Sequence, residues 1–202
     1  MAELWTTLAS QARTFAPLEV IAVLSAIAYL FLAIRQNIWC WFGAAISTAI
    51  YVYLFIVARL YMESALNFFY FAMAIYGWYV WHGGKSGDRD LPVSVWPLRV
   101  HAVAILTIVA TSVANGYVLA RYTNAAYPYI DSMTTWGAIW ATFLVARKVL
   151  ENWWYWLVID IASIAIYWTR GLQLTSILFI IYVLMIPFGI LAWRRSWREQ
   201  TV

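Results

Sequence analysis

Charged side chains are scarce in this sequence. Only 11% of its 202 residues are Asp, Glu, Lys or Arg, whereas 65% are apolar and 19% are aromatic. Soluble globular proteins have about 25% charged and about 45–50% apolar residues, so this chain lacks the polar surface that would cover a water-soluble globule. The composition therefore excludes a soluble enzyme, a disordered protein and a nucleic-acid-binding domain, although the net charge is +4.

Metal-ligating and redox-active side chains are also few. Cys40 is the single cysteine and cannot form an intramolecular disulfide. The two histidines, His82 and His101, are far apart in the sequence and give no zinc-ligand pattern. The chain has neither a phosphate-binding glycine-rich loop nor a Ser-His-Asp set. We therefore expect no enzymatic activity, no metal and no cofactor, and we expect both histidines to face water.

Long apolar runs dominate the sequence instead. Seven segments approach the roughly 20 residues that a helix needs to cross a bilayer. They are Val20–Ile34, Ile38–Ala58, Ser64–Trp81, Ala102–Ala120, Ser132–Ala146, Asn152–Thr169 and Gly171–Trp193. The predicted fold class is an all-α integral membrane protein with seven transmembrane helices. Residues 82–101 contain several glycines and prolines, which indicates a linker.

Basic residues are distributed unequally between the two sides of the predicted bundle. One side receives Arg35, Lys85, Arg89, Arg99, Arg147, Lys148, Arg194, Arg195 and Arg198, and the other receives Arg13, Arg59, Arg121 and Arg170. The positive-inside rule then places the C-terminus in the cytoplasm and the N-terminus outside. Residues 194–202 become a cytoplasmic tail. Residues 1–16 lack signal-peptide features and become an extracytoplasmic segment that could form an interfacial helix.

The sequence contains an internal repeat. Leu60, Ser64, Leu66, Tyr70, Gly77 and Trp81 recur 112 residues later, whereas Asn37, Trp39 and Trp41 recur at an offset of 115, and Ser47 and Tyr51 at 116. The repeats are residues 17–81 and 121–193, with three spans each, and residues 102–120 form one further span between them. Three spans plus one is even, so both units enter the membrane from the same side. Such parallel repeats place a substrate path at their interface, which suggests a transporter.

A carboxylate and an amide lie inside predicted spans. Asp160 is central in the sixth span, where a carboxylate costs roughly 2.5–3.5 kcal/mol. It could contact a substrate or an ion, or it could be held structurally by Ser163 or Tyr182. Asn67 in the third span could likewise contact substrate or form an interhelical hydrogen bond.

Two tryptophans accompany this carboxylate. Trp153 and Trp156 share a helix face with Asp160, and two indoles beside a carboxylate can stack a flat ring and attract a cation. The alternative role for each tryptophan is anchoring in an interfacial aromatic belt.

Two stretches carry a family resemblance: LNFFYFAMAIYGWYVW at residues 66–81 and DSMTTWGAIWATFLVARKVLENWWYWLVIDI at residues 131–161. They resemble the PnuC family of vitamin transporters. The resemblance implies a three-plus-one-plus-three helix arrangement. It also implies uptake of an unphosphorylated vitamin by facilitated diffusion, with intracellular phosphorylation as the trap.

Nicotinamide riboside is the best-known substrate of that family, and related branches carry thiamine and riboflavin. The nicotinamide-riboside branch tends to have Asn where this chain has Asp160, and Gln where it has Asn67. An aspartate pairs well with the aminopyrimidine or thiazolium of thiamine, but nicotinamide riboside is also a ring cation. Nicotinamide riboside and thiamine therefore remain close alternatives, with riboflavin third.

The predicted site is central, and its members fall into three groups. Ring-stacking residues are Trp41, Trp153 and Trp156; polar-edge residues are Asn67, Thr142 and Asp160; path-lining or gating residues are the tyrosines Tyr51, Tyr70, Tyr167 and Tyr182. The expected partners are a small vitamin substrate and the lipid bilayer, without nucleic acid. A homo-oligomer, dimer or trimer, is left open. A non-transporting receptor or assembly subunit and a membrane-embedded enzyme remain the rival functions.

Overall fold

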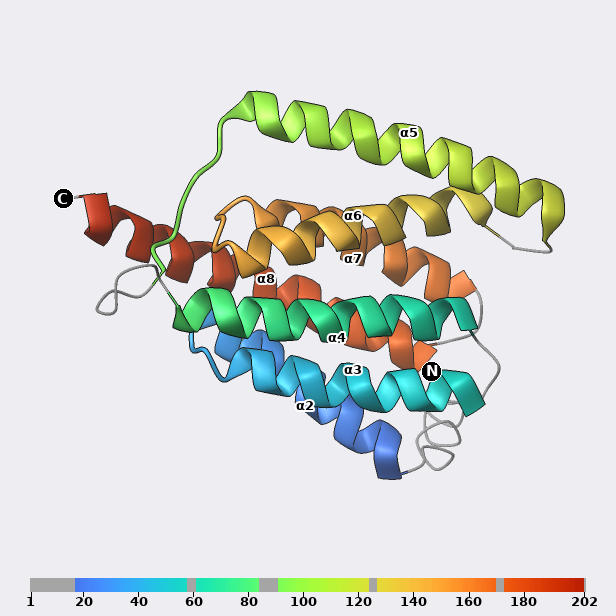
Figure 1. Ribbon diagram of the computed structural model, residues 1–202, viewed down its shortest axis with the longest axis horizontal. Helices are drawn as coiled ribbons and strands as arrows, with labels where there is room; N and C mark the ends of the chain where they lie inside the picture. Colours follow the sequence, from blue (N-terminus) through green and yellow to red (C-terminus); the bar gives the residue numbers. More distant parts are fainter. Residues whose placement is uncertain (1–16, 58–60, 84–90, 124–126, 170–172, 202) are drawn as a thin grey trace, which may run out of the picture.

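The computed structural model describes residues 17–57, 61–83, 91–123, 127–169 and 173–201. Within them, seven helices run roughly along the long axis of the molecule (Figure 1). They are α2 (Pro17–Ile34), α3 (Cys40–Val57), α4 (Tyr61–His82), α5 (Leu98–Tyr122), α6 (Pro128–Ala146), α7 (Asn152–Thr169) and α8 (Gln173–Thr201). The all-α, seven-helix prediction is confirmed. The predicted N-terminal segment, residues 1–16, lies outside the described residues.

The outer surface of the bundle is apolar. By length and composition, Pro17–Ile34, Leu98–Tyr122 and Ser176–Gln200 could each cross a membrane. Large apolar side chains are exposed along the helices, including Leu106 at 70% and Val158 at 68%. An apolar surface of this extent requires a nonpolar environment, which a bilayer supplies.

Two helices extend further than the apolar runs predicted. Helix α5 begins at Leu98, so the last residues of the predicted linker are already helical. Helix α8 continues through the predicted tail, where Arg195 and Glu199 form an exposed ion pair at 2.8 Å, one helical turn apart. Such pairs support a helix in water, which explains why α8 continues beyond its apolar run. The bounds of α7 agree with the prediction.

Two units of three helices form the bundle. The middle helix of each unit, α3 or α7, packs against both of its neighbours. Between the units, α4 contacts α6, and α8 contacts α2. These two interfaces exchange under a two-fold rotation that swaps the units. Helix α5 packs against α6 on one side of the bundle (Figure 1).

The turns that join the first two helices of each unit have the same backbone conformation. Gln36 follows α2 with a φ of 54°, and Lys148 follows α6, 112 residues later, with a φ of 49°. Left-handed conformations are uncommon for residues other than glycine. Their recurrence at this spacing shows that the two units share one local fold.

The third helix of each unit is tied to the second by a serine. The Ser64 hydroxyl donates to the Val52 carbonyl oxygen, and the Ser176 hydroxyl donates to the Ile164 carbonyl oxygen, both at 3.1 Å. The offset between α3 and α7 is therefore 112, and the offsets of 115 and 116 predicted there are wrong. With fourteen tryptophans in the chain, similar tryptophan spacings can match out of register.

The corrected register changes which residues are equivalent. Trp41 corresponds to Trp153 rather than to Trp156, and Tyr51 corresponds to Ser163 rather than to Tyr167. Tyr70 and Tyr182, by contrast, remain an equivalent pair.

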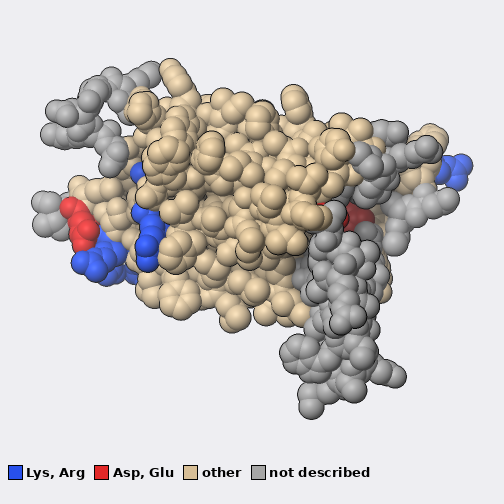
Figure 2. All heavy atoms as spheres, turned by 90° about the horizontal axis from the view of Figure 1, so that it is seen from below, with Lys and Arg blue, Asp and Glu red and all other residues tan. Residues whose placement is uncertain are grey.

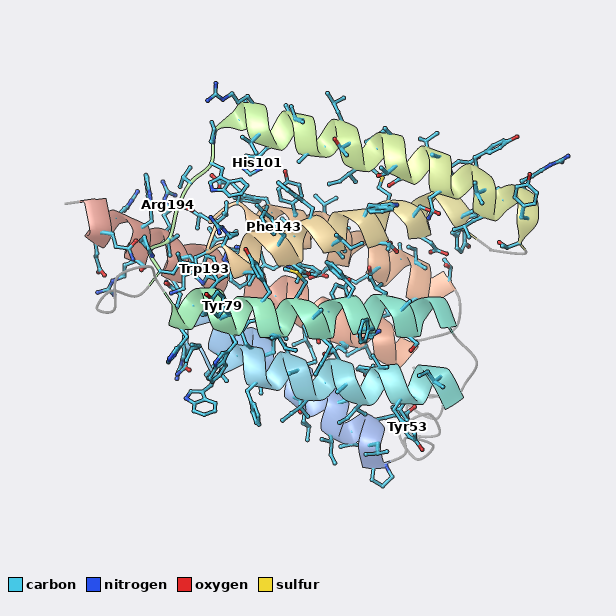
Figure 3. All side chains as sticks on the ribbon, in the orientation of Figure 1. Tyr53, Tyr79, His101, Phe143, Trp193 and Arg194 are labelled. Atoms are coloured by element: carbon cyan, nitrogen blue, oxygen red, sulfur yellow. The ribbon has the colours of Figure 1, made fainter. Side chains whose placement is uncertain are left out.

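Four tryptophans form a continuous row across both units. The ring centroids are 5.4 Å apart from Trp41 to Trp81, 6.4 Å from Trp81 to Trp193, and 5.5 Å from Trp193 to Trp153. We call these four residues the tryptophan row. Trp193 directly precedes Arg194 on α8 (Figure 3). The row thus closes the bundle at the end where Lys and Arg gather (Figure 2), which we call the basic end.

Hydrogen bonds from the row join the two units. The Trp81 indole N–H donates to the Ala146 carbonyl oxygen at 3.1 Å, and the Trp193 indole N–H donates to the Ala33 carbonyl oxygen at 3.0 Å. All four residues are buried. Each unit therefore binds the other through a helix-end carbonyl, by the same type of contact.

Candidate substrate site

Asp160 is buried in the middle of α7. Its side chain is only 3% exposed, and among the described residues its Oδ1 atom has no hydrogen-bond partner. Its carboxylate lies within electrostatic range of the phenolic groups of Tyr70 and Tyr182. A buried carboxylate oxygen without a partner is costly, so the site is suited to a ligand that supplies a cation or a donor.

The two tyrosines beside Asp160 are related by the two-fold repeat. Tyr70 lies on α4 and Tyr182 on α8, 112 residues apart. Tyr29 of α2 lies within electrostatic range of both. These three phenols and the carboxylate come from four different helices, so they form a cluster between the units. We call this group of residues the central cluster.

Sequence reasoning missed Tyr29. A signal for it exists in the sequence, because Ser25 and Tyr29 are the two residues of the predicted span Val20–Ile34 that carry a hydroxyl group.

Trp156 and Tyr70 pack against the same small buried cluster. It consists of Ala138 and Ala141 of α6 and Ile159 of α7. The hydroxyl of Thr142, which is 7% exposed, donates to the Ala138 carbonyl oxygen at 2.7 Å. A hydroxyl that has donated its proton can still accept hydrogen bonds. The Thr142 hydroxyl can therefore still accept a hydrogen bond from a ligand.

Trp41 and Trp153 have a packing role in the structure. A Cβ atom placed on Gly77 would lie 2.3 Å from the Trp41 ring, and one on Gly189 would lie 2.5 Å from the Trp153 ring. Both indoles are thus covered by a glycine of the neighbouring helix and by the next tryptophan of the row, Trp81 or Trp193. A substrate could stack on either indole ring only if the contact between that ring and its glycine opened.

The remaining predicted residues lie near the equivalent tyrosines. Tyr51 is within electrostatic range of Tyr182. Tyr167 stacks on Phe179 at 5.3 Å, and Phe179 packs edge-on against Tyr182 at 5.7 Å. Asn67, half-buried on α4, lies one turn before Tyr70. The structure therefore places Asp160 and the tyrosines Tyr51, Tyr70, Tyr167 and Tyr182 near one another, whereas Trp41 and Trp153 belong to the tryptophan row.

His101 is buried, so the prediction that it faces water is wrong. It is 6% exposed, and its Nδ1 atom lies 2.9 Å from the hydroxyl oxygen of Tyr155 on α7. Its Nε2 atom lies 3.9 Å from the Glu151 carboxylate. The early start of α5 is the reason, because it places His101 in the first turn of that helix, on the side facing the bundle (Figure 3).

Comparison with known proteins identifies the family of the chain. Residues 16–195 match the family described as "Nicotinamide mononucleotide transporter". The chain belongs to this family. The prediction of PnuC-family membership, and that of a transporter rather than an enzyme, are thereby confirmed.

Individual members of the family are distant relatives. The nicotinamide riboside transporter PnuC of Escherichia coli is 27% identical over 208 aligned positions, which cover 91% of this chain and 87% of that protein. The riboflavin/roseoflavin transporter RibM of Streptomyces davaonensis is 26% identical over 175, covering 84% and 81%. A crystal structure of the vitamin B3 transporter PnuC shares the fold, with a TM-score of 0.72 at 21% identity over 97% of this chain and 90% of that one.

Proposed function

We propose that this family member takes up a small aromatic cationic vitamin or precursor by facilitated diffusion across a bacterial inner membrane. Nicotinamide riboside and thiamine are the two leading candidates, and riboflavin is third. Intracellular phosphorylation would then trap the substrate. The named relatives are a nicotinamide riboside transporter and a riboflavin/roseoflavin transporter, which supports uptake of a vitamin or precursor.

Asp160 is the observation that carries this proposal. A carboxylate in the middle of a span marks a substrate path more often than a structural contact, and one oxygen of Asp160 has no hydrogen-bond partner in the described part of the chain. The pyridinium of nicotinamide riboside, or the thiazolium and aminopyrimidine of thiamine, would offset its burial. Riboflavin is neutral and offers no such charge, which is why it ranks third.

The aromatic residues of the central cluster supply the rest of the binding surface. Trp156 would stack on the flat ring, while Tyr70 and Tyr182 would approach it from opposite units. Asn67 and Thr142 would bind its polar edge, and Tyr51 and Tyr167 would line the path. An aromatic face beside a carboxylate favours a planar cation over a neutral ring.

The tryptophan row would act as the inner gate. It closes the basic end through contacts between the units, so rocking one unit against the other would part it. Parallel-repeat transporters expose a midplane site alternately to the two sides in this way. Trp41 and Trp153 would then uncover their ring faces only as the gate opens.

Substitution of the carboxylate tests the proposal. We expect Asp160→Asn to weaken binding of the cationic substrate roughly 10- to 100-fold, the equivalent of about 1.5–3 kcal/mol for a hydrogen bond to a charged group. The measurement is isothermal titration calorimetry with nicotinamide riboside, thiamine and riboflavin, followed by uptake into proteoliposomes. Asp131→Asn, in the first turn of α6, is the matched control and should bind as the wild type does.

Three other outcomes would contradict the proposed site, substrate class or function. Wild-type affinity in Asp160→Asn would remove this residue from the site. Binding of riboflavin alone would overturn the cationic substrate class. Absence of binding and uptake for all three compounds, with a folded protein, would favour a receptor or an assembly subunit.

A further inference from the structure

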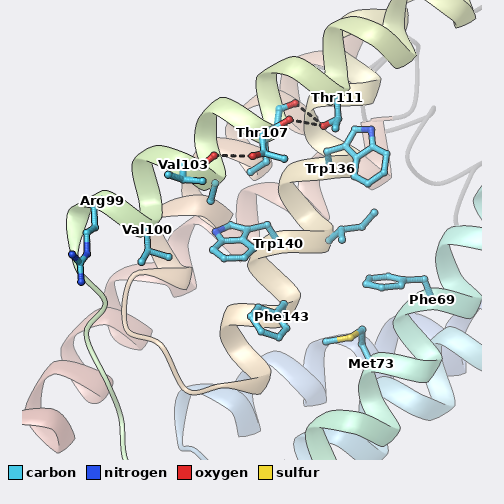
Figure 4. Close-up of a pocket in the computed structure, with 13 residues that line it drawn as sticks. Phe69, Met73, Arg99, Val100, Val103, Thr107, Thr111, Trp136, Trp140 and Phe143 are labelled. Carbon is cyan, nitrogen blue, oxygen red and sulfur yellow. Dashed lines mark hydrogen bonds between the residues drawn. The ribbon is translucent and has the colours of Figure 1, made fainter.

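A groove lies between α4, α5 and α6, on the side of the bundle where α5 packs against α6 (Figure 4). Its volume is about 810 Å³. Apolar side chains from all three helices line it, including Phe69 of α4, Val103 of α5 and Phe143 of α6. The residues of the central cluster do not contribute to its lining, so the groove is separate from the proposed substrate site.

The two threonine hydroxyl groups along the groove already donate hydrogen bonds within α5. The hydroxyl of Thr107 donates to the Val103 carbonyl oxygen at 2.9 Å, and that of Thr111 donates to the Thr107 carbonyl oxygen at 2.8 Å (Figure 4). Both threonine hydroxyl groups therefore donate their protons to the α5 backbone and not to a ligand in the groove. The body of the groove favours a hydrocarbon chain over a polar ligand.

One end of the groove differs in chemistry from its body. Arg99 lines that end, in the first turn of α5, and its side chain is exposed. A guanidinium binds phosphate through paired hydrogen bonds. The positive end of the α5 dipole adds to the attraction for an anion. The complementary ligand is a long apolar chain with an anionic headgroup.

We propose that this groove binds an anionic phospholipid, with an acyl chain along α5 and α6 and the phosphate on Arg99. Helix α5 presents further apolar residues outward beside the groove, such as Leu106 at 70% exposure. The groove therefore opens sideways, toward the bilayer, rather than toward water. Basic pockets between transmembrane helices on the cytoplasmic side bind anionic headgroups in the same manner.

Native mass spectrometry of the full chain in neutral detergent tests this proposal. The probes are dioleoyl phosphatidylglycerol, which is anionic, and dioleoyl phosphatidylcholine, which is zwitterionic. We expect the wild type to retain phosphatidylglycerol preferentially. Arg99→Gln should reduce its affinity about fivefold, the factor that corresponds to ~1 kcal/mol per arginine near an anionic headgroup, and should remove the preference.

A second variant tests the groove rather than the charge. Ala104→Trp places an indole inside the lining and should displace both lipids. The matched controls are on the same helix: Arg121→Gln at the far end of α5, and Ala110→Trp on an exposed position outside the lining. Both controls should bind lipid as the wild type does.

Three results would overturn the proposal. The first is equal retention of both lipids by the wild type, and the second is an equal loss of phosphatidylglycerol in Arg121→Gln and Arg99→Gln. The third is an oligomer that Ala104→Trp dissociates while lipid binding is unchanged, which would assign the groove to a second copy of the chain. Arg99 is exposed, so Arg99→Gln remains decisive even if Ala104→Trp does not fold.

Discussion

Two glycines set how closely the second and third helices of each unit approach. Gly77 on α4 faces the Trp41 ring, and Gly189 on α8 faces the Trp153 ring. Because glycine has no side chain, the backbone of the third helix can pack directly against the indole ring of the second helix. This contact is repeated in both units and supports the tryptophan row that joins them.

A methyl group at either glycine should therefore destabilise the protein. Gly77→Ala would place a Cβ atom 2.3 Å from a ring that has no free space, and overpacking of this kind costs about 1–3 kcal/mol of unfolding free energy. The measurement is thermal unfolding in detergent, followed by fluorescence-detected size exclusion.

A third buried glycine provides the control. In Gly137→Ala, the nearest atoms would be the flexible end of Ile159 at 3.3 Å, so a small shift of that side chain relieves the contact. Equal loss of stability in Gly77→Ala and Gly137→Ala would contradict the specific role of the tryptophan contact.

The segment before α5 acts as a strap on the second unit. The Ser94 N–H donates to the Lys148 carbonyl oxygen at 3.0 Å, and the Leu150 N–H donates to the Ser94 carbonyl oxygen at 2.8 Å. The Val93 N–H donates to the Gln200 side chain at 3.0 Å. These bonds fix the strap, residues 91–97, to the α6–α7 turn and to the end of α8. The strap thus distinguishes the second unit from the first.

Cysteine cross-linking tests the position of the strap. Ser94 and Val149 form a parallel bridge, and such pairing separates Cα atoms by about 4.7–4.9 Å, within the range of about 4.4–6.8 Å for disulfides. In a Cys40→Ser background, Ser94→Cys with Val149→Cys should form a disulfide under mild oxidation. The readout is the loss of free thiols to a maleimide-polyethylene-glycol gel shift.

The internal repeat supplies the control pair. Asn37 is the equivalent of Val149 in the first unit, 112 residues earlier. Ser94→Cys with Asn37→Cys should keep both thiols free. If this pair cross-links equally well, the strap is not specific to the second unit.

Positive charge on the described residues is concentrated at one end of the molecule (Figure 2). Arg194, Arg195 and Arg198 follow the last buried tryptophan of α8, and Arg147 ends α6 at the same level. Arg121 lies at the opposite end of the bundle, in the last turn of α5. The positive-inside bias predicts that the basic end faces the cytoplasm.

Thiol labelling of single-cysteine variants tests this orientation. In a Cys40→Ser background, Tyr122→Cys lies at the end of α5 away from the basic end, and Glu199→Cys lies at the basic end; the native side chains are 78% and 64% exposed. A membrane-impermeant maleimide should label Tyr122→Cys, but not Glu199→Cys, in intact cells. Inverted membrane vesicles are the control and should reverse the pattern; the same pattern in both preparations would contradict it.

The number of helices could be predicted from the sequence because span length is a local property. A run of about 20 apolar residues satisfies its backbone internally as a helix and buries its side chains in lipid, whatever its neighbours are. The bounds of α7 followed from this alone. The pairing of Tyr70 with Tyr182 could also be predicted, since the third helices of the two units match at a single offset.

Contacts between helices depend on which faces meet, and nearly uniform apolar faces contain little information on that point. The equivalence of Trp41 and Trp153, the burial of His101 and the approach of Tyr29 to the central cluster became clear only in three dimensions. Composition and apolar run length thus determined a seven-helix membrane protein with a carboxylate inside a span, and the internal repeat and the family resemblance added the transporter function. Tertiary packing decided the register of the repeats, the groove beside α5 and the residues that surround Asp160, because each arises from side chains that lie far apart in the chain.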